Sequence, residues 1–290
     1  MNYKKSTVDI IFDVFLYTFL TLLMVVWIYP IVSVFAMSFS SPAPLKAGKV
    51  TFYPIGFTIN PYIDSFRNQN LLLGYLNTIQ YAGVGTLLML FFTSLCAYAL
   101  STPSLVMRRF FTLYWAIPMF FGGGLIPSYL MIKALGLIDT FWVMVLPGCV
   151  AGGTLFVFRA FFSQLPYETR ESAYIDGAND IVICLRIILP LSKPLLATYA
   201  LFSIVGHWNS WFSALLYLRD QWRMPLQIYL RRLLIIADIS SLRFEALSSM
   251  INTKGVQMAT TVIAIVPILA VYPFLQRYFV KGVMIGTIKG

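Results

Sequence analysis

Residues 165–194 read LPYETRESAYIDGANDIVICLRIILPLSKP, a polar stretch within an otherwise apolar chain. Seven charged side chains fall between residues 168 and 193, whereas charged residues make up only 11% of the whole sequence. A segment this polar is not stable in lipid, so we expect a folded loop outside the bilayer. The pattern predicts a helix from Glu171 to Ile175, a turn at Gly177 and a second helix closed by Leu189-Pro190. Such a helix-turn-helix is suited to docking against another protein.

The composition of the chain indicates an integral membrane protein. Of its 290 residues 59% are hydrophobic, and the mean hydropathy is +0.79. Soluble domains carry roughly 25% charged residues, more than twice the share found here. Lys4 and Lys5 precede a long apolar run without a small-residue cleavage site, so we expect the first span to be retained. The net charge of +10 fits basic loops of a membrane protein better than nucleic-acid binding.

Six apolar stretches approach the roughly 20 residues that a membrane-spanning helix needs. The sequence therefore predicts an all-α polytopic protein with one transmembrane domain over residues 1–290. The charged loop occupies residues 163–194, and two longer polar loops, residues 38–73 and 219–256, are expected outside the cell. The six expected spans cover residues 11–37, 74–100, 109–130, 140–162, 195–218 and 257–280.

An even number of spans places both termini on one side of the membrane. If that side is the cytoplasm, 11 of the 21 Lys and Arg residues lie inside and 10 outside. The positive-inside rule therefore barely decides the orientation, and the charged loop has to settle it.

No feature of the sequence suggests chemistry carried out by this chain. It lacks a Gly-x-x-x-x-Gly-Lys-Ser/Thr phosphate loop, and Gly83-Val84-Gly85 lacks the third glycine of a dinucleotide fingerprint. We expect no metal, no bound cofactor and no catalytic residue, so any energy from ATP must come from another polypeptide. The three cysteines are read as small packing residues rather than a disulfide framework: Cys96, Cys149 and Cys184.

The charged loop resembles the EAA loop of permease subunits of ATP-binding cassette (ABC) importers. The resemblance rests on Leu165-Pro166, Glu171, Asp176-Gly177-Ala178 and the run from Leu189-Pro190 to Pro194. In that family the loop forms short coupling helices that lie in a groove of the ATPase subunit. Ser172 departs from the alanine of the family, but both residues are small. The implied coupling residues are Glu171, Ser172, Ala173, Asp176, Gly177, Ala178, Leu189 and Pro190.

Three further stretches extend the resemblance over almost the whole chain, to carbohydrate-uptake permeases of the LplC/YtcP branch. They are GGLIPSY at 123–129, GHWNSWF at 206–212 and residues 272–290, which begin YPFLQRYF. The second permease of the maltose importer is more distantly similar, and alginate and rhamnogalacturonan-fragment importers have subunits of this kind. The resemblance implies a type I ABC importer fold in the bacterial inner membrane.

The resemblance also implies an assembly. The chain would form half of a heterodimeric pore with a homologous permease, and two ATPase subunits that use ATP-Mg would drive it. An extracytoplasmic solute-binding protein would deliver an oligosaccharide. Closure of the ATPase dimer would move the coupling helices and rock the spans between inward-facing and outward-facing states. Glu171 and Asp176 would pair with basic groups of the ATPase, while acid–base catalysis by these carboxylates is the weak alternative.

A second group of residues suggests a substrate path. A lone histidine in a span is usually a packing or hydrogen-bonding residue, but an asparagine in a span often faces a cavity. Aromatic rings present flat apolar faces on which sugar rings could stack. The candidate path residues are His207, Trp208, Asn209 and Trp211.

Two glycine-rich stretches and the C-terminal tail each allow two interpretations. Gly122-Gly123-Gly124 and Gly148 to Gly153 favour close helix packing, or alternatively a gate or broken helix. The tail is either a frayed end or a second ATPase contact through Gly286, Lys289 and Gly290, because tails of the resembling permeases insert between ATPase subunits.

Basic residues in the outer loops exceed acidic ones by five. This excess is either ordinary solvated loop charge or a means of attracting an acidic oligosaccharide or an acidic binding protein.

Two other classes of membrane protein were considered, and the sequence lacks the features that each would need. A membrane-embedded enzyme would need a cluster of histidines or paired carboxylates. A secondary transporter would need ionisable residues within its spans and an internal repeat.

Overall fold

The computed structural model describes residues 6–242 and 253–287, and the side chains of residues 6–235 and 254–271. Within these ranges the chain is helical, with no strand. It divides into two compact units, which are described separately. The first consists of the described residues up to 69 and those from 230 to 266, and the second of residues 70–229 and 267 onward.

The first unit begins with α1 (Thr7–Ser38), a long helix whose most apolar 18-residue window is only 6% buried. Its side chains therefore face outward, as lipid or a partner subunit requires. The loop after it, predicted as external, contains α2 (Pro42–Lys46) and α3 (Asn60–Arg67). The hydroxyl of Tyr62 lies 2.8 Å from that of Ser38 and so ties α3 to the end of α1.

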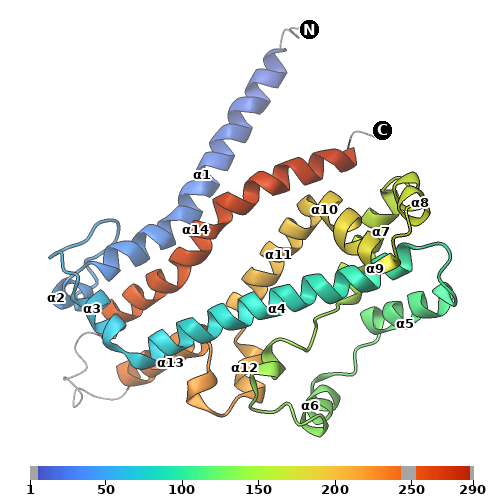
Figure 1. Cartoon of the computed structure of the whole chain (residues 1–290). Helices are drawn as coiled ribbons and strands as arrows, with labels where there is room; N and C mark the ends of the chain where they lie inside the picture. Colours follow the sequence, from blue (N-terminus) through green and yellow to red (C-terminus); the bar gives the residue numbers. More distant parts are fainter. Residues whose placement is uncertain (1–5, 243–252, 288–290) are drawn as a thin grey trace. The chain divides into compact units, whose positions relative to one another are not determined.

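The second unit is organised along α4 (Gln69–Ser101), which crosses Figure 1 as one long helix. Near its start, Asn77 donates to the carbonyl oxygen of Trp222 at 2.6 Å and Tyr81 to that of Arg223 at 2.8 Å. Near its end, Tyr98 contacts the charged loop. With a rise of 1.5 Å per residue, about 32 Å separates Asn77 from Tyr98, close to the thickness of the hydrocarbon core. The two sets of contacts thus lie a bilayer apart.

Three of the predicted spans consist of shorter helices joined by unwound backbone. Span 109–130 contains α5 (Arg108–Phe120) and α6 (Leu125–Ala134), with a break at the three glycines. Span 140–162 contains the 3-10 turn η1 (Phe141–Met144) and α7 (Gly152–Gln164). Span 195–218 contains α11 (Lys193–Trp208) and α12 (Phe212–Tyr217).

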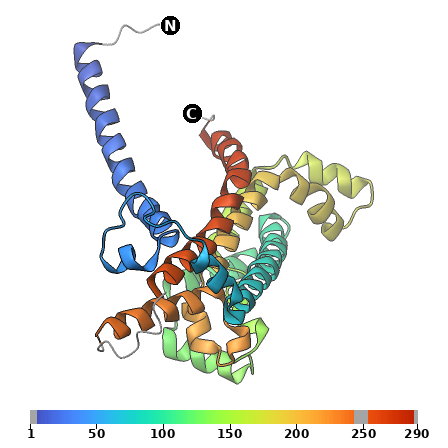
Figure 2. The same ribbon diagram turned by 90° about the vertical axis from the view of Figure 1, so that its left-hand side faces the viewer.

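The charged segment folds as the predicted helix-turn-helix. The first helix is α8 (Glu168–Ile175), and the second combines α9 (Asp180–Ile183), the π-turn η2 (Cys184–Ile188) and α10 (Leu189–Leu191). The axis then turns by 84° into α11, so the second helix closes just after Leu189-Pro190. We call residues 168–191 the coupling hairpin. Figure 2 shows it, in yellow, projecting to one side.

The remaining elements are the 3-10 turn η3 (Gln221–Arg223), α13 (Leu226–Leu242) and α14 (Thr253–Thr287). By length and composition, three of the described helices could cross a membrane, or four if the bent pair Asp180–Leu191 and Lys193–Trp208 is one span. Six crossings therefore stays a prediction. In the predicted tail contact, Gly286 belongs to α14, whereas Lys289 and Gly290 lie outside the described residues.

Candidate functional site

The turn of the coupling hairpin depends on Gly177, whose φ of +83° is a conformation that costs other residues roughly 1–2 kcal/mol. The side chain of Asn179 then caps the second helix by accepting the backbone N–H of Val182 at 2.9 Å. Open space surrounds Gly177, so the turn requires glycine for its backbone conformation and not for lack of room.

Arg170 fixes α8 to the ends of α4 and α7. Only 3% of its surface is exposed, and its guanidinium donates to the hydroxyl of Ser101 and to the carbonyl oxygen of Phe162, both at 3.0 Å. The same group lies 5.1 Å from the centre of the Tyr98 ring, within the range of cation–π attraction. These contacts satisfy a buried charge that would otherwise be costly, and so make α8 a rigid attachment.

Asp180 joins both helices of the hairpin to α4. Its Oδ1 atom accepts the hydroxyl of Tyr98 at 2.8 Å and that of Tyr174 at 2.6 Å. We call these three residues the tyrosine clasp. The hydrogen bond to Asp180 raises the pKa of Tyr174, so the phenol stays protonated and able to donate at neutral pH. An apolar cluster lies beneath the clasp and includes Ala173, Ile183, Cys184 and Ile188.

Some of the predicted coupling residues lie where the coupling hairpin is attached to the other helices, and the rest lie on its outer surface. Glu171, Ser172, Asp176, Gly177 and Pro190 are exposed. Ala173 is buried, and Ala178 and Leu189 are half-buried against the apolar cluster. The anchoring roles of Arg170 and Asp180 were not predicted from the sequence, and neither was the exposed apolar tip, where Ile175 is 82% exposed.

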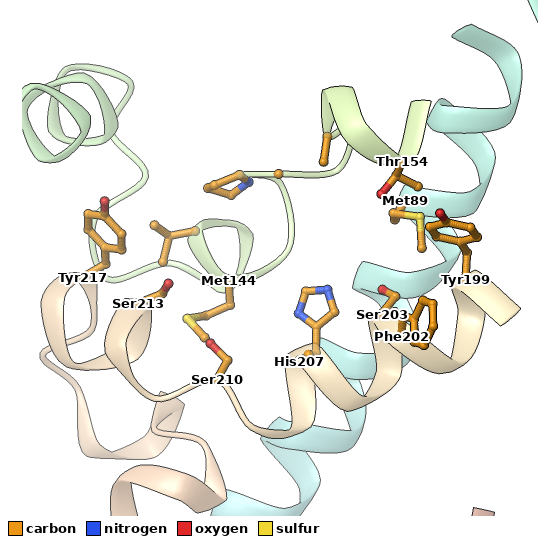
Figure 3. A pocket seen from close by; sticks show the side chains of 15 residues that line it. Met89, Met144, Thr154, Tyr199, Phe202, Ser203, His207, Ser210, Ser213 and Tyr217 are labelled. Carbon is orange, nitrogen blue, oxygen red and sulfur yellow. The ribbon is translucent and has the colours of Figure 1, made fainter. Parts of the chain in front are cut away.

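A cavity of about 460 Å³ lies in the second unit, away from the coupling hairpin. Side chains from α4, η1, α7, α11 and α12 line it, and Figure 3 shows how they converge. Two breaks between helices also contribute, through Pro147, Gly148 and Ala151 after η1 and through Ser210 after α11. Broken helices at membrane depth are tolerated where they line a cavity, so the cavity gives these breaks a physical reason.

A polar stripe runs along the cavity face of α11 and into α12. Tyr199, Ser203, His207 and Ser210 recur at helical spacing, and Ser213 and Tyr217 continue the stripe. The hydroxyl of Thr86 on α4 donates to that of Ser203 at 3.0 Å. This stripe was not predicted, although polar residues spaced three to four apart within an apolar segment are a signal that the sequence contains.

His207 projects from α11 into the cavity, with Ser203 to one side and Ser210 and Met144 to the other (Figure 3). Gly85 of α4 leaves room for the ring, because a Cβ atom at that position would collide with the imidazole. Close approach of α4 to α11 thus holds the ring where it borders the cavity.

Of the four predicted path residues, His207 lines the cavity and the other three lie elsewhere. Trp208 is 5% exposed, meets the ring of Tyr75 in a T-shaped, edge-to-face contact and borders a small apolar crevice beside α14. Asn209 is exposed at the end of α11, and Trp211 packs against an apolar cluster around Tyr217.

The glycine-rich stretches contain one site of close helix packing and two helix breaks, whereas a gating role stays a prediction. Gly152 lets α7 approach α5, since a Cβ atom there would lie 2.7 Å from the carbonyl oxygen of Trp115. Gly124 and Gly148 instead have φ values of +82° at the two breaks. The three cysteines are free thiols, and the described residues contain no group of three or more metal-ligating side chains.

The fold and the coupling hairpin define a class of membrane transport subunit. The chain belongs to the family of binding-protein-dependent transport system inner membrane components, whose family model matches residues 89–285. It is a permease subunit of an ABC importer, as the resemblance of the coupling loop predicted.

Particular relatives narrow the comparison. The chain is 40% identical to Protein LplC of Bacillus subtilis (strain 168), over 97% of this chain and 95% of that protein. It is 34% identical to the polygalacturonan/rhamnogalacturonan transport system permease protein YtcP of the same organism, over 97% and 99%. A solved structure, described as a bacterial ABC transporter involved in the import of the acidic polysaccharide alginate, matches with a TM-score of 0.89. There the identity is 31%, over 96% of this chain and 100% of that one.

Proposed function

We propose that this chain is one of two homologous permease subunits of an importer that moves an oligosaccharide across the inner membrane. Two ATPase subunits that hydrolyse ATP-Mg drive the assembly, and an extracytoplasmic binding protein delivers the sugar. Relatives that carry saccharides support this substrate class. One is YtcP, and another is an arabinooligosaccharides permease of Halalkalibacterium halodurans that is 30% identical over 91% of the chain. The acidic substrates of YtcP and of the alginate importer make an acidic sugar one option.

The observation that carries the coupling role is the contrast between the two sides of the coupling hairpin. Arg170 and Asp180 attach its base to α4, whereas Glu171, Ile175 and Asp176 face outward. A rigid element with a free outer face can transmit the movement of a docked ATPase into the membrane helices. In this proposal the exposed carboxylates meet basic groups of the ATPase, and the apolar tip enters its groove.

The same role fixes the orientation in the membrane. Because ATP is cytoplasmic, the coupling hairpin lies in the cytoplasm, and six crossings then place both termini there. The tail, through Gly286, Lys289 and Gly290, provides a second ATPase contact in this arrangement. The polar cavity around His207 forms part of the substrate path in this proposal, whereas Trp208, Asn209 and Trp211 stay candidate contacts outside the cavity.

The test compares Gly177→Asp and Glu171→Ala with the parent chain in the reconstituted importer. Gly177→Asp introduces both a strained φ and a negative charge at the docking turn, so we expect loss of uptake and of binding-protein-stimulated ATP hydrolysis. Glu171→Ala removes one polar contact and should reduce stimulation about 3- to 10-fold.

Gly48→Asp is the matched control for Gly177→Asp. Gly48 also has a positive φ, +65°, and open space around it, but it lies in the loop expected outside the cell. This variant also places an aspartate at a positive φ and should keep full stimulation. Normal uptake by Gly177→Asp would refute the coupling role of the hairpin.

A further inference from the structure

The cavity around His207 has the chemistry of a site for an uncharged polyol. Its lining carries six hydroxyl groups, and none of its fifteen described residues is Lys, Arg, Asp or Glu. Its volume of about 460 Å³ falls within the roughly 300–1,000 Å³ typical of ligand sites. The hydroxyl-bearing residues are Thr154, Tyr199, Ser203, Ser210, Ser213 and Tyr217.

Hydroxyl groups suit a saccharide because each can both donate and accept a hydrogen bond, as sugar hydroxyls do. The rings of Tyr199, Phe202 and Tyr217 add apolar faces for the C–H side of a sugar ring. A carboxylate in the same place would lose water and gain no cationic partner from this lining, which is costly. The cavity therefore fits a neutral sugar face and disfavours an acidic group.

His207 differs from the other polar lining residues because its imidazole offers a donor and an acceptor on a rigid ring. Gly85 holds this ring in place by allowing α4 and α11 to approach. Thr86, the next residue of α4, donates to Ser203 and so orients a neighbouring hydroxyl. Two adjacent residues of α4, Gly85 and Thr86, therefore position side chains of the polar stripe without lining the cavity themselves.

We propose that this subunit itself bears a saccharide subsite in this cavity, which binds the uncharged hydroxyl face of a sugar. His207 is its specificity-determining residue and Gly85 a positioning residue. The proposal rests on the proposed import function and adds a substrate contact to this half of the pore. It also implies that any preference for an acidic sugar arises outside this cavity, in the outer loops or in a partner.

The first experiment measures uptake by the complete importer in proteoliposomes, with arabinotriose and trigalacturonate as probes and saturating binding protein. His207→Ala should raise the KM of each transported probe about 3- to 10-fold, as expected for one or two lost neutral hydrogen bonds. His207→Gln keeps a donor and an acceptor and should change KM less than about twofold. ATP hydrolysis per transported sugar should stay unchanged, because the coupling hairpin is intact.

A pair of glycine variants on α4 tests the positioning role. Gly85→Ala should reproduce the KM increase of His207→Ala, although Gly85 does not line the cavity. Gly83→Ala adds the same methyl group two residues away, where nothing lies within 4 Å, and should match the parent chain. Equal behaviour of the two glycine variants would overturn the positioning role.

Binding is measured directly with a cysteine in place of Ser213, on a background without the native cysteines. Each transported probe should slow its reaction with a maleimide, and His207→Ala should weaken that protection. If the importer carries both probes but neither KM nor protection depends on His207, the subsite is wrong while the import function stands. Failure to transport any saccharide would instead refute the proposed function. An increase in KM confined to trigalacturonate would show that His207 binds a carboxylate. It would overturn the proposal that the subsite binds an uncharged face of the sugar.

Discussion

Asp139 links two loops of the second unit through its carboxylate and its unusual backbone. Its Oδ1 atom accepts the backbone N–H groups of Arg219 at 3.0 Å and Asp220 at 3.1 Å, and its own N–H donates to the carbonyl oxygen of Tyr217. These two bonds, that from Arg219 first, hold the pKa of the Asp139 carboxyl below its usual value. Asparagine tolerates the φ of +56° and keeps an accepting oxygen, so Asp139→Asn removes chiefly the charge.

We predict that Asp139→Asn lowers the thermal midpoint of the purified importer at pH 7 by about 1–3 °C, a small effect because the site is partly solvated. A lowered folded-state pKa stabilises the protein above the unfolded pKa, and this stabilisation disappears as pH falls through the folded value. The difference between variant and parent should therefore shrink below about pH 4. Asp176→Asn, on an exposed carboxylate, is the control. A difference independent of pH would attribute the effect to geometry instead of charge.

Individual residues differ in how far their roles could be read from the sequence. Gly177 was predicted as a turn residue, because turn chemistry is local and φ is positive there. Arg170 was not recognised as an anchor, because it contacts Ser101, which lies 69 positions away. Asp180 meets Tyr98 across 82 positions. A single sequence reveals the charge of such residues but not the distant surface that buries it.

The tyrosine clasp acts at the scale of whole helices, since it joins both helices of the coupling hairpin to α4. Tyr98→Phe removes one hydroxyl donor to Asp180 and leaves the ring in place. A hydrogen bond to a partly exposed carboxylate contributes roughly 1–2 kcal/mol. We predict that movement of the hairpin with the ATPase is then only partly transmitted to α4. The amount of sugar transported per ATP hydrolysed should therefore fall about 2- to 5-fold.

The measurement is uptake and ATP hydrolysis on the same proteoliposomes. Tyr167→Phe removes an exposed hydroxyl at the start of α8 and should leave the ratio unchanged. If Tyr98→Phe lowers both rates in proportion, the clasp supports folding of the subunit and not the transmission of movement.

Helices were predictable as apolar segments but not as continuous rods. The apolar stretches at 109–130, 140–162 and 195–218 have the length of a span, yet each is interrupted. Hydropathy averages over a window and does not sense whether a break faces lipid or a cavity. Gly148 and Ser210 lie at two such breaks and line the cavity. Tertiary surroundings therefore decide whether unwound backbone is tolerated.

Across the whole molecule, α4 is long enough to cross the bilayer, so the contacts at its two ends predict on which side the loops of the second unit lie. The loop at 218–226 meets the start of α4 through Asn77 and Tyr81, and the coupling hairpin meets its end through Tyr98. Asp139 in turn joins residues 135–140 to the loop at 218–226. Residues 135–140 therefore lie toward the end of α4 opposite the hairpin, and we expect them on the opposite side of the membrane. The count of Lys and Arg could not decide this orientation.

The predicted side of residues 135–140 distinguishes a chain that crosses the membrane six times from one that crosses it four times. If only α1, α4, the bent pair and α14 crossed, residues 102–179 would all remain on the side of the coupling hairpin, Lys133 included. With six crossings, the broken span at 109–130 carries Lys133 to the other side. We predict that a cysteine in place of exposed Lys133, on a background without native cysteines, reacts with a membrane-impermeant maleimide added outside intact cells.

Two reference positions calibrate the labelling. Lys49→Cys should react from outside, and Glu168→Cys only in inverted vesicles, whether the chain crosses the membrane six times or four. Labelling of Lys133→Cys with the pattern of Lys49→Cys establishes that 109–130 crosses despite its break at the glycines. Labelling with the pattern of Glu168→Cys would mean that α5 and α6 turn back within the membrane. The bonds from Arg219 and Asp220 to Asp139 would then have to span the bilayer, which hydrogen bonds of 3.0 and 3.1 Å cannot do.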